Sequence, residues 1–245
     1  MRLKGGDPLV FGRGAEEAEY LNAQGIAFEI VPGITSAVSV PAYLGIPVTH
    51  RDMASSFHVV TAHKKDGSFP DISYDALVKG GGTLVFLMGV HTVKDVAEGL
   101  LKSNMPPETP AAVLERGTTA RQRKIKGTIA DIARKAVEEK VQSPAIILVG
   151  QAAGEEQMEW YDKRPLAGKK FVVTRPREQK DKLSALLREK GAEVLEAPTI
   201  RIVPIEENPA LDEALEKIVD YSWLVFTSPT GVQIFKDYLK KHLID

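Results

Sequence analysis

Short apolar stretches alternate along the chain with segments in which apolar residues recur every three or four positions, a spacing typical of amphipathic helices. The short apolar stretches are typical of buried strands. We expect strands at 28–31, 57–62, 83–88, 111–115, 145–149, 171–174, 193–197, 199–204 and 223–227. This alternation of strands and helices favours an α/β fold with mainly parallel sheets.

The helical segments carry start and stop signals. Gly25 and Gly191 follow two of them, where a left-handed C-terminal cap favours glycine. Thr35 or Ser36 can cap another, in which Pro41 restarts a turn that ends near Gly45. We also expect helices over 15–24, 91–102 and 211–219. A further helix carries Leu183, Leu186 and Leu187. Another is capped by Thr128, and its apolar residues are Ile129, Ile132, Ala133, Ala136 and Val137.

The composition indicates a globular chain. Its 245 residues are 43% hydrophobic, which is enough for one large or two ordinary domains. A net charge of -1 gives no overall field that favours nucleic acid or an anionic membrane. Residues 1–4 are followed by glycines, and no apolar run is long enough to span a bilayer. We therefore expect a soluble protein of the cytoplasm.

The sequence gives little indication of a metal site or of a phosphate-binding loop. The chain has no cysteine, which excludes disulfides and thiolate ligands within it. His58 and His63 stand an odd number of residues apart and would face opposite sides of a strand, so we expect no metal site. The glycines at 80–82 precede a strand, whereas a phosphate-binding loop follows one. The basic stretch 121–126 lacks aromatic residues and favours a solvated edge strand.

A glycine-rich segment near the start has the properties of a ligand loop. Gly5 and Gly6 let a backbone approach a ligand closely, Asp7 follows at once, and Pro8 fixes the exit. These residue types also form ordinary turns. The longer strings RLKGGDPLVFGRGAEEAEYL and VPGITSAVSVPAYLGIPVTHR, however, resemble the tetrapyrrole methylases, and most closely the uroporphyrinogen-III C-methyltransferases.

A second resemblance lies further along the chain. The segments VVTRPRE at 172–178 and LVFTSPTGV at 224–232 resemble uroporphyrinogen-III synthase, which is known fused to such methylases. The resemblances imply methylase-like α/β/α domains followed by the start of a synthase-like α/β domain. We expect part of the first methylase domain at 1–52, the second at 53–150, a linker with an aromatic anchor (Trp160, Tyr161) at 151–168, and the synthase-like part at 169–245.

The first resemblance implies methyl transfer from S-adenosylmethionine to uroporphyrinogen III, giving precorrin-2 for sirohaem or cobalamin, and a homodimer. The family's first Gly-rich loop and its proposed acid or base have no counterpart here, so we expect an incomplete first domain, an incomplete synthase part and unassigned catalytic residues. Matching by motif places the cofactor contacts on Gly5, Gly6, Asp7, Val10, Thr35, Ser36, Met88 and Gly117.

The substrates of both activities are rich in carboxylates, for which arginine is a natural partner. Arg13, Arg51 and Arg116 lie beside the methylase motifs, although each can equally be a solvated surface residue. For the synthase-like part, the resemblance implies closure of hydroxymethylbilane without a cofactor, and the matching residues are Arg175, Thr227, Ser228 and Thr230.

Two other functions stay open. A methylase acting on a later precorrin shares part of the loop motifs, although the synthase-like segment argues against it. A non-catalytic module that binds S-adenosylmethionine or a tetrapyrrole is the alternative from a different class. In either case we expect a small-molecule partner, and neither nucleic acid nor membrane.

Overall fold

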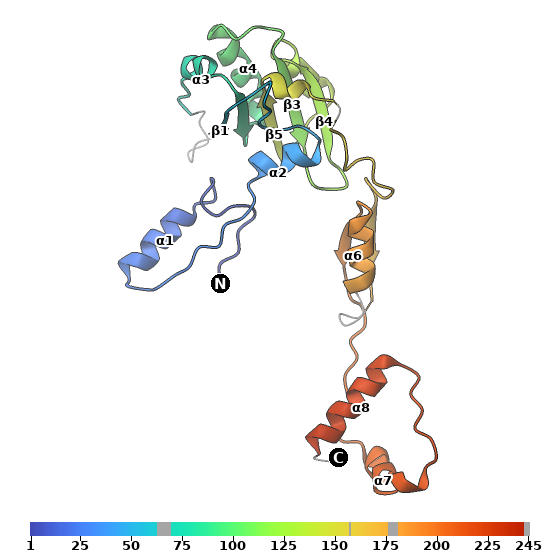
Figure 1. The fold of residues 1–245 in the computed structure, drawn as a ribbon. Coiled ribbons are helices and arrows are strands. Elements are labelled where there is room, and N and C mark those ends of the chain that lie inside the picture. Colours follow the sequence, from blue (N-terminus) through green and yellow to red (C-terminus); the bar gives the residue numbers. More distant parts are fainter. Residues whose placement is uncertain (63–69, 157, 176–180, 243–245) are drawn as a thin grey trace. The chain divides into compact units, whose positions relative to one another are not determined.

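The computed structural model describes residues 1–62, 70–156, 158–175 and 181–242 (Figure 1). The chain divides into two compact units. The first unit is Met1–Val173 with Asp181–Glu196, and the second is Thr174–Lys180 with Ala197–Asp245. The predicted residue His63 and part of the motif at 172–178 lie outside the described residues.

A five-stranded sheet forms the centre of the first unit, in the order β1-β2-β5-β3-β4. Its strands are β1 (Phe57–Thr61), β2 (Thr83–Leu87), β3 (Pro110–Glu115), β4 (Arg123–Thr128) and β5 (Ala145–Val149). These strands confirm the predicted positions, and β4 is the edge strand expected from the basic stretch.

The prediction of a mainly parallel sheet was wrong. Among the described strands of this five-stranded sheet, only β1 and β2 pair in parallel, whereas β5 runs antiparallel to both β2 and β3, and β4 antiparallel to β3. For β3 and β4 the reason is their connection, which is a short loop without a helix. Such a loop joins antiparallel neighbours, because a parallel pair needs a longer crossover.

Helices cover both faces of this sheet, as Figure 1 shows. On one face lie α3 (Tyr74–Gly80), α4 (Val93–Lys102) and α5 (Ile132–Glu138), and on the other lies α2 (Ser36–Tyr43). Alternate residues of β2 point to opposite faces: Phe86 packs with the first group, while Val85 packs with α2. All five residues of β2 are therefore buried.

The helix after β4 begins later than predicted. Thr128 ends β4, and its N–H donates to Oδ1 of Asp131 at 2.7 Å, so Asp131 rather than Thr128 stands at the start of α5. Ile132 is buried as expected, but Val137 is 77% exposed because it lies on the outer side of the helix end. The sequence pattern did not predict α3.

The N-terminal segment contains α1 (Gly14–Ala23), which has no buried residue. Gly25 follows it with a φ of 67°, which confirms the predicted cap. Thr35 caps α2 as predicted, whereas Pro41 lies inside the helix and restarts nothing. The strand predicted at 28–31 is absent, because no strand in the described part of the chain pairs with this stretch.

A parallel pair of strands completes the first unit. β6 (Lys170–Val173) and β7 (Glu193–Glu196) flank α6 (Asp181–Glu189) in a strand-helix-strand arrangement, as the pattern predicted. Upstream of β6, Ala152 and Ala153 are buried in a short 3-10 helix, η2 (Gln151–Gly154). Trp160 donates its indole N–H to the carbonyl of Ala42 at 2.8 Å.

The second unit consists of helices and connecting segments in its described residues. They are α7 (Pro209–Glu216), the short 3-10 helix η4 (Ile218–Asp220) and α8 (Pro229–Lys241). Tyr238 of α8 donates a hydrogen bond to Asp212 of α7. The strands predicted at 199–204 and 223–227 are absent, since no described strand lies beside them, and α8 was not predicted.

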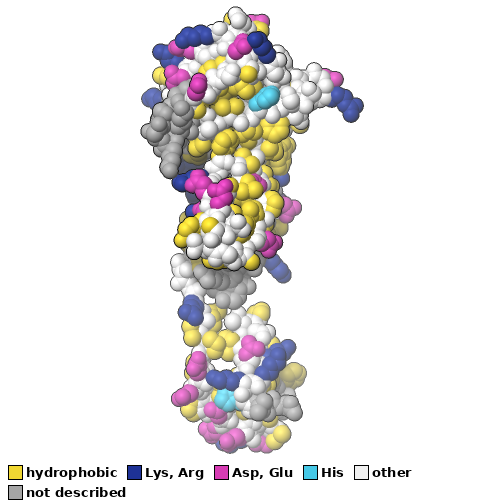
Figure 2. Space-filling view, turned by 90° about the vertical axis from the view of Figure 1, so that its left-hand side faces the viewer, with side chains coloured by type: hydrophobic (Ala, Val, Ile, Leu, Met, Phe, Trp, Pro, Cys, Tyr) yellow, Lys and Arg dark blue, Asp and Glu magenta, His cyan; other side chains and the backbone are white. Residues whose placement is uncertain are grey.

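Hydrophobic side chains are visible on the surface of both units (Figure 2). The exposed large hydrophobic residues include Leu9, Phe11 and Ile34 of the N-terminal segment in the first unit, and Val203 and Trp223 in the second. Among the described helices, none combines the length and apolar character needed to cross a membrane.

Candidate functional site

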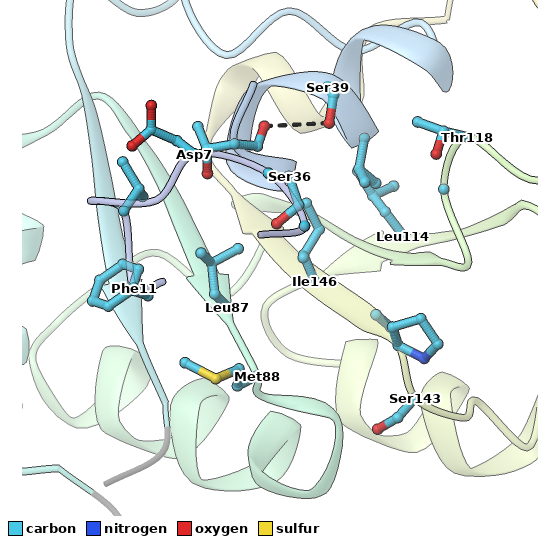
Figure 3. Close-up of a pocket in the computed structure, with 18 of the residues that line it drawn as sticks. Asp7, Phe11, Ser36, Ser39, Leu87, Met88, Leu114, Thr118, Ser143 and Ile146 are labelled. Carbon is cyan, nitrogen blue, oxygen red and sulfur yellow. Dashed lines mark hydrogen bonds between the residues drawn. The ribbon is translucent and has the colours of Figure 1, made fainter. Parts of the chain in front are cut away.

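A cavity of about 820 Å³, here called the main cavity, opens in the first unit (Figure 3). It lies where the N-terminal loops meet α2 and the ends of three sheet strands. Its lining comes from residues 5–7, 10–12, 34–36, 39–40, 87–88, 90–91, 114, 117–118 and 143–146. The volume matches a small-molecule site.

The main cavity brings together residues that are far apart in the sequence. All eight residues that the first resemblance associates with the cofactor line it, namely Gly5, Gly6, Asp7, Val10, Thr35, Ser36, Met88 and Gly117. Figure 3 shows Asp7 and Phe11 on one side of the cavity and Leu114 and Thr118 on the other. The sequence motifs therefore converge on one place.

Asp7 joins two of the loops around the main cavity. Its Oδ2 accepts the backbone N–H of Gly33 at 3.0 Å, and its Oδ1 accepts that of Leu9 at 2.8 Å. The hydrogen bond from Gly33, followed by that from Leu9, lowers the pKa of the Asp7 carboxyl below its ordinary value. The carboxylate thus stays charged at neutral pH at the edge of the cavity.

The start of α2 presents polar groups to the cavity. The hydroxyl of Thr35 accepts the backbone N–H of Ala37 at 3.3 Å. The hydroxyl of Ser39 donates to the carbonyl of Thr35 at 3.2 Å, as the dashed line in Figure 3 marks. Ser36 lines the cavity at the first residue of the helix, where backbone N–H groups have no partner within the helix.

Three residues other than glycine line the cavity in the left-handed region. They are Phe11 with a φ of 52°, Met88 with 59° and Thr118 with 69°. This backbone conformation costs free energy for such residues and clusters at functional sites. Met88 directly follows β2 and is 53% exposed, whereas the preceding Leu87 is 6% exposed. Met88 is thus a cavity wall and not a core residue.

Gly117 lies where the loop after β3 passes close to α2. A Cβ placed there would lie 2.4 Å from Cγ1 of Val40, which is too close for any side chain. Glycine is therefore required for this wall of the cavity to approach α2.

Sequence reasoning missed several lining residues. Ser39, Val40, Leu114, Thr118 and Ser143 all line the cavity but are not among the residues that the resemblance associates with the cofactor. Thr118 directly follows Gly117, and Ser39 lies one turn after Thr35, so neighbourhood to the motif residues was the available signal. Ser143 comes from a distant loop, and the sequence held no signal for it.

The predicted substrate arginines occupy different environments. Arg13 lines a smaller cavity of about 440 Å³, here called the basic cavity, together with Arg2, Lys4, Gly5, Gly12, Glu16 and Glu17. Its guanidinium contacts Glu16, with an Nη2–Oε2 distance of 2.6 Å, and this contact raises the pKa of Arg13. Arg51 is exposed and lines neither cavity.

Arg116 is engaged by neighbouring side chains. Its Nη2 donates to Oε1 of Gln142 at 3.0 Å, and its Nε lies 3.5 Å from Oε1 of the buried Glu115. Its backbone has a φ of 48°, and its N–H donates to the carbonyl of Pro144 at 2.8 Å. These contacts hold the base of the loop that carries Gly117.

The four residues matched to the synthase lie in the second unit. Ser228 caps α8, with its Oγ accepting the N–H of Gly231 at 3.0 Å. Thr227 precedes it and is exposed, and Thr230 is half-buried in the first turn of α8. Arg175 is exposed. Within the described residues, no group of three or more His, Cys, Asp or Glu side chains is arranged to hold a metal ion.

Comparisons with known proteins match both parts of the chain. A family model described as Tetrapyrrole (Corrin/Porphyrin) Methylases matches residues 1–133. A second family model, described as Uroporphyrinogen-III synthase HemD, matches residues 181–245.

Two curated relatives align with the chain from end to end. Porphyrin biosynthesis protein HemD of Ruminiclostridium josui is 46% identical over 100% of this chain and 49% of its own length. Uroporphyrinogen-III C-methyltransferase of Bacillus subtilis (strain 168) is 41% identical over 100% of this chain and 50% of its own length. The chain thus spans about half the length of these relatives.

A solved structure resembles the first unit. It is the uroporphyrin-III C-methyl transferase of Thermus thermophilus in complex with S-adenyl homocysteine. It has 37% sequence identity and a TM-score of 0.55, and the match covers 62% of this chain and 66% of that protein.

Proposed function

Because the chain belongs to the tetrapyrrole (corrin/porphyrin) methylase family, we propose that it takes part in the S-adenosylmethionine-dependent C-methylation of uroporphyrinogen III to precorrin-2. The observation that carries this proposal is the main cavity. Eight residues matched to the cofactor by motif, taken from four separate stretches of sequence, line this one cavity.

The main cavity fits S-adenosylmethionine chemically. The cofactor has an apolar adenine ring, hydroxyl groups and a charged amino acid end. Val10, Leu87 and Leu114 supply apolar wall, while Asp7 and the first residues of α2 supply acceptors and donors. A Cβ at Gly5 would meet no protein atom within 4 Å, so this glycine leaves open space.

The residues of the chain have a positioning role in this proposal. Bound S-adenosylmethionine supplies an activated methyl group to the electron-rich pyrrole carbon of the substrate. Methyl transfer needs the donor, the methyl carbon and the acceptor in line, which makes orientation the main contribution of the protein. The rigid loops around Asp7, Met88 and Gly117 fix that orientation, and Arg13 and Arg51 would bind carboxylates of the substrate.

We further propose that residues 169–245 contribute to a uroporphyrinogen-III synthase, with Arg175, Thr227, Ser228 and Thr230 binding the substrate. The domain boundaries at 52, 150 and 168 belong to the same proposal. The exposed apolar residues of the N-terminal segment, such as Leu9 and Ile34, support a homodimer through the methylase part. The proposed location is the cytoplasm.

Calorimetric titration with S-adenosylhomocysteine tests the cofactor site. We expect the wild-type chain to bind, and Gly5→Val to bind at least about tenfold more weakly because the branched side chain occupies the cavity. Gly154→Val is the matched control, because a Cβ there lies 3.4 Å from Pro110 and Gly154 is not among the residues that line the cavity. A folded wild-type chain that does not bind, or equal binding by Gly5→Val, would contradict the proposal.

A further inference from the structure

The loop between β3 and β4 is held from outside the methylase-matched region. Thr118, which lines the main cavity, donates its backbone N–H to Oε1 of Gln122 at 2.9 Å. The same amide of Gln122 donates through Nε2 to Oδ1 of Asp162 at 2.7 Å. One side chain therefore connects the cavity wall to the segment that precedes β6.

A second contact reaches the loop from β7. Ala120 donates its backbone N–H to Oε2 of Glu193 at 3.1 Å. Glu193 also forms an ion pair with Lys170 of β6, and this contact, followed by the one with Ala120, lowers its pKa. The carboxylate is thus charged at neutral pH and oriented toward the loop.

The segment that carries Asp162 is itself fixed at both ends. Trp160 donates to the carbonyl of Ala42 at the end of α2, and its ring packs edge-on against Tyr43. Tyr161 is 8% exposed, and its hydroxyl donates to the carbonyl of Gly191 at 3.3 Å. Arg164 lies 4.7 Å above the Trp160 ring. Asp162 therefore occupies a defined position and does not belong to a free tether.

We propose that Asp162 and Glu193 are positioning residues for the main cavity, acting through Gln122 and Ala120. The segment after the methylase-matched region would then set the affinity of the cavity for its ligand. This inference rests on the proposed function, since it takes S-adenosylhomocysteine as the ligand of the main cavity.

The conformation of the loop gives the contacts their importance. Thr118 has a φ of 69°, which is unfavourable for a residue with a branched side chain. Such a conformation persists only when surrounding contacts determine it. If the contacts from Asp162 and Glu193 are lost, other loop conformations become populated. The apparent affinity then equals the intrinsic affinity multiplied by the fraction of chains that keep the binding conformation.

Reversing the polarity of the Gln122–Asp162 contact tests its role. Gln122→Glu still accepts from Thr118 but places a carboxylate opposite Asp162, so we expect binding of S-adenosylhomocysteine to weaken about fivefold. Asp162→Asn keeps an acceptor for Gln122 but loses the charge, so it should weaken binding less than Gln122→Glu does. Gln122→Glu combined with Asp162→Asn restores a donor and an acceptor, and affinity should recover.

The contact from β7 is tested with a matched pair of variants. Glu193→Ala removes the acceptor for Ala120 and should weaken binding about fivefold. Glu196→Ala removes a carboxylate of the same strand that contacts Arg188 at 3.0 Å, and should leave affinity unchanged. Calorimetry is performed well below the unfolding temperature of each variant, so that a loss of stability alone does not change the measured affinity.

The outcomes separate this inference from the proposed function. A wild-type chain that fails to bind S-adenosylhomocysteine contradicts the proposed function. A wild-type chain that binds, with Gln122→Glu and Glu193→Ala binding equally well, overturns the inference alone. If Glu193→Ala does not fold, the double variant Gln122→Glu with Asp162→Asn still decides the question. Failure of this variant to recover affinity would show that the Asp162 contact does not position the loop.

Discussion

The carboxylate of Asp7 accepts a hydrogen bond from the backbone N–H of Gly33, a residue 26 positions further along the chain, at an Oδ2–N distance of 3.0 Å. The two loops also touch through their backbones, because a Cβ at Gly33 would lie 2.3 Å from the carbonyl oxygen of Gly6. The loop carrying Gly6 and the loop leading into α2 therefore form one wall of the main cavity only when both contacts are in place.

The Asp7–Gly33 contact predicts a pH dependence at the cavity edge. Hydrogen bonds from Gly33 and Leu9 lower the pKa of Asp7 below its ordinary 3.8, so the ionised form stabilises the folded loops. That contribution is complete at pH values above 3.8 and is lost as the pH falls through the lower, folded-state pKa. In the wild type, the chemical shift of the Gly33 amide should change with pH and report the pKa of Asp7. It should show no such titration in Asp7→Asn, and an unchanged titration would refute the assignment.

Gly33→Ala is expected to separate the two loops. The new methyl group would overlap the carbonyl of Gly6, a backbone atom that cannot move without shifting its loop. We expect the free energy of unfolding to fall by roughly 1–3 kcal/mol, as at other overpacked sites, and the unfolding temperature to fall with it. Gly5→Ala in the same loop is the control, because its methyl group meets no protein atom within 4 Å. Equal unfolding temperatures for the two variants would argue against the backbone contact.

Gly117→Ala should reduce ligand affinity through its contact with α2. The added Cβ would lie 2.4 Å from Cγ1 of Val40, which is 8% exposed and cannot turn away into solvent. Val40→Ala removes both conflicting methyl groups, so the double variant should recover part of the affinity for S-adenosylhomocysteine. A double variant as weak as Gly117→Ala, measured by calorimetry, would mean that the loop and not the contact is responsible.

The sequence was informative where a local rule applies. The Thr35 cap and the glycine at 25 depend on neighbouring residues, and each is found at the predicted place. The Gly5-Gly6-Asp7 motif is equally local, and it lines the main cavity. The contacts of Gln122 with Thr118 and Asp162 depend on how distant segments of the chain meet, and no pattern of residue types in the sequence predicts them. The motif residues of the cavity wall were therefore predictable, whereas the contacts that hold the loop after β3 were not.

Strand direction shows the same limit. The apolar run of β5 predicted a buried strand with the correct bounds, because burial on both faces requires apolar residues at every position. Its insertion between β2 and β3 in an antiparallel sense depends on the chain path through α5, which apolar patterns do not encode. The run at 28–31 is also mostly apolar, with Phe28, Ile30 and Val31 around one glutamate, yet all four of its residues are exposed, Val31 at 71%.

The edge of the sheet supplies the last prediction. Glu115 is 5% exposed at the end of β3, and its Oε2 accepts from Nε of Arg123 on β4 at 2.8 Å. Arg123→Ala would leave a buried carboxylate with only the more distant Arg116, at 3.5 Å. We expect a loss of about 2 kcal/mol in the free energy of unfolding, since hydrogen bonds to charged groups contribute about that much.

Two further variants separate this effect from the loss of any arginine. Arg134→Ala breaks an exposed pair with Glu138 and should cost no more than about 0.5 kcal/mol. Adding Glu115→Gln to Arg123→Ala removes the unpaired charge and should recover part of the stability, because a neutral amide is less costly to bury than a carboxylate. Urea unfolding compares the variants. If Arg123→Ala and Arg134→Ala lose the same stability, the buried position of Glu115 has no energetic consequence, and the base of the Gly117 loop must be held by Arg116 and Gln142 instead.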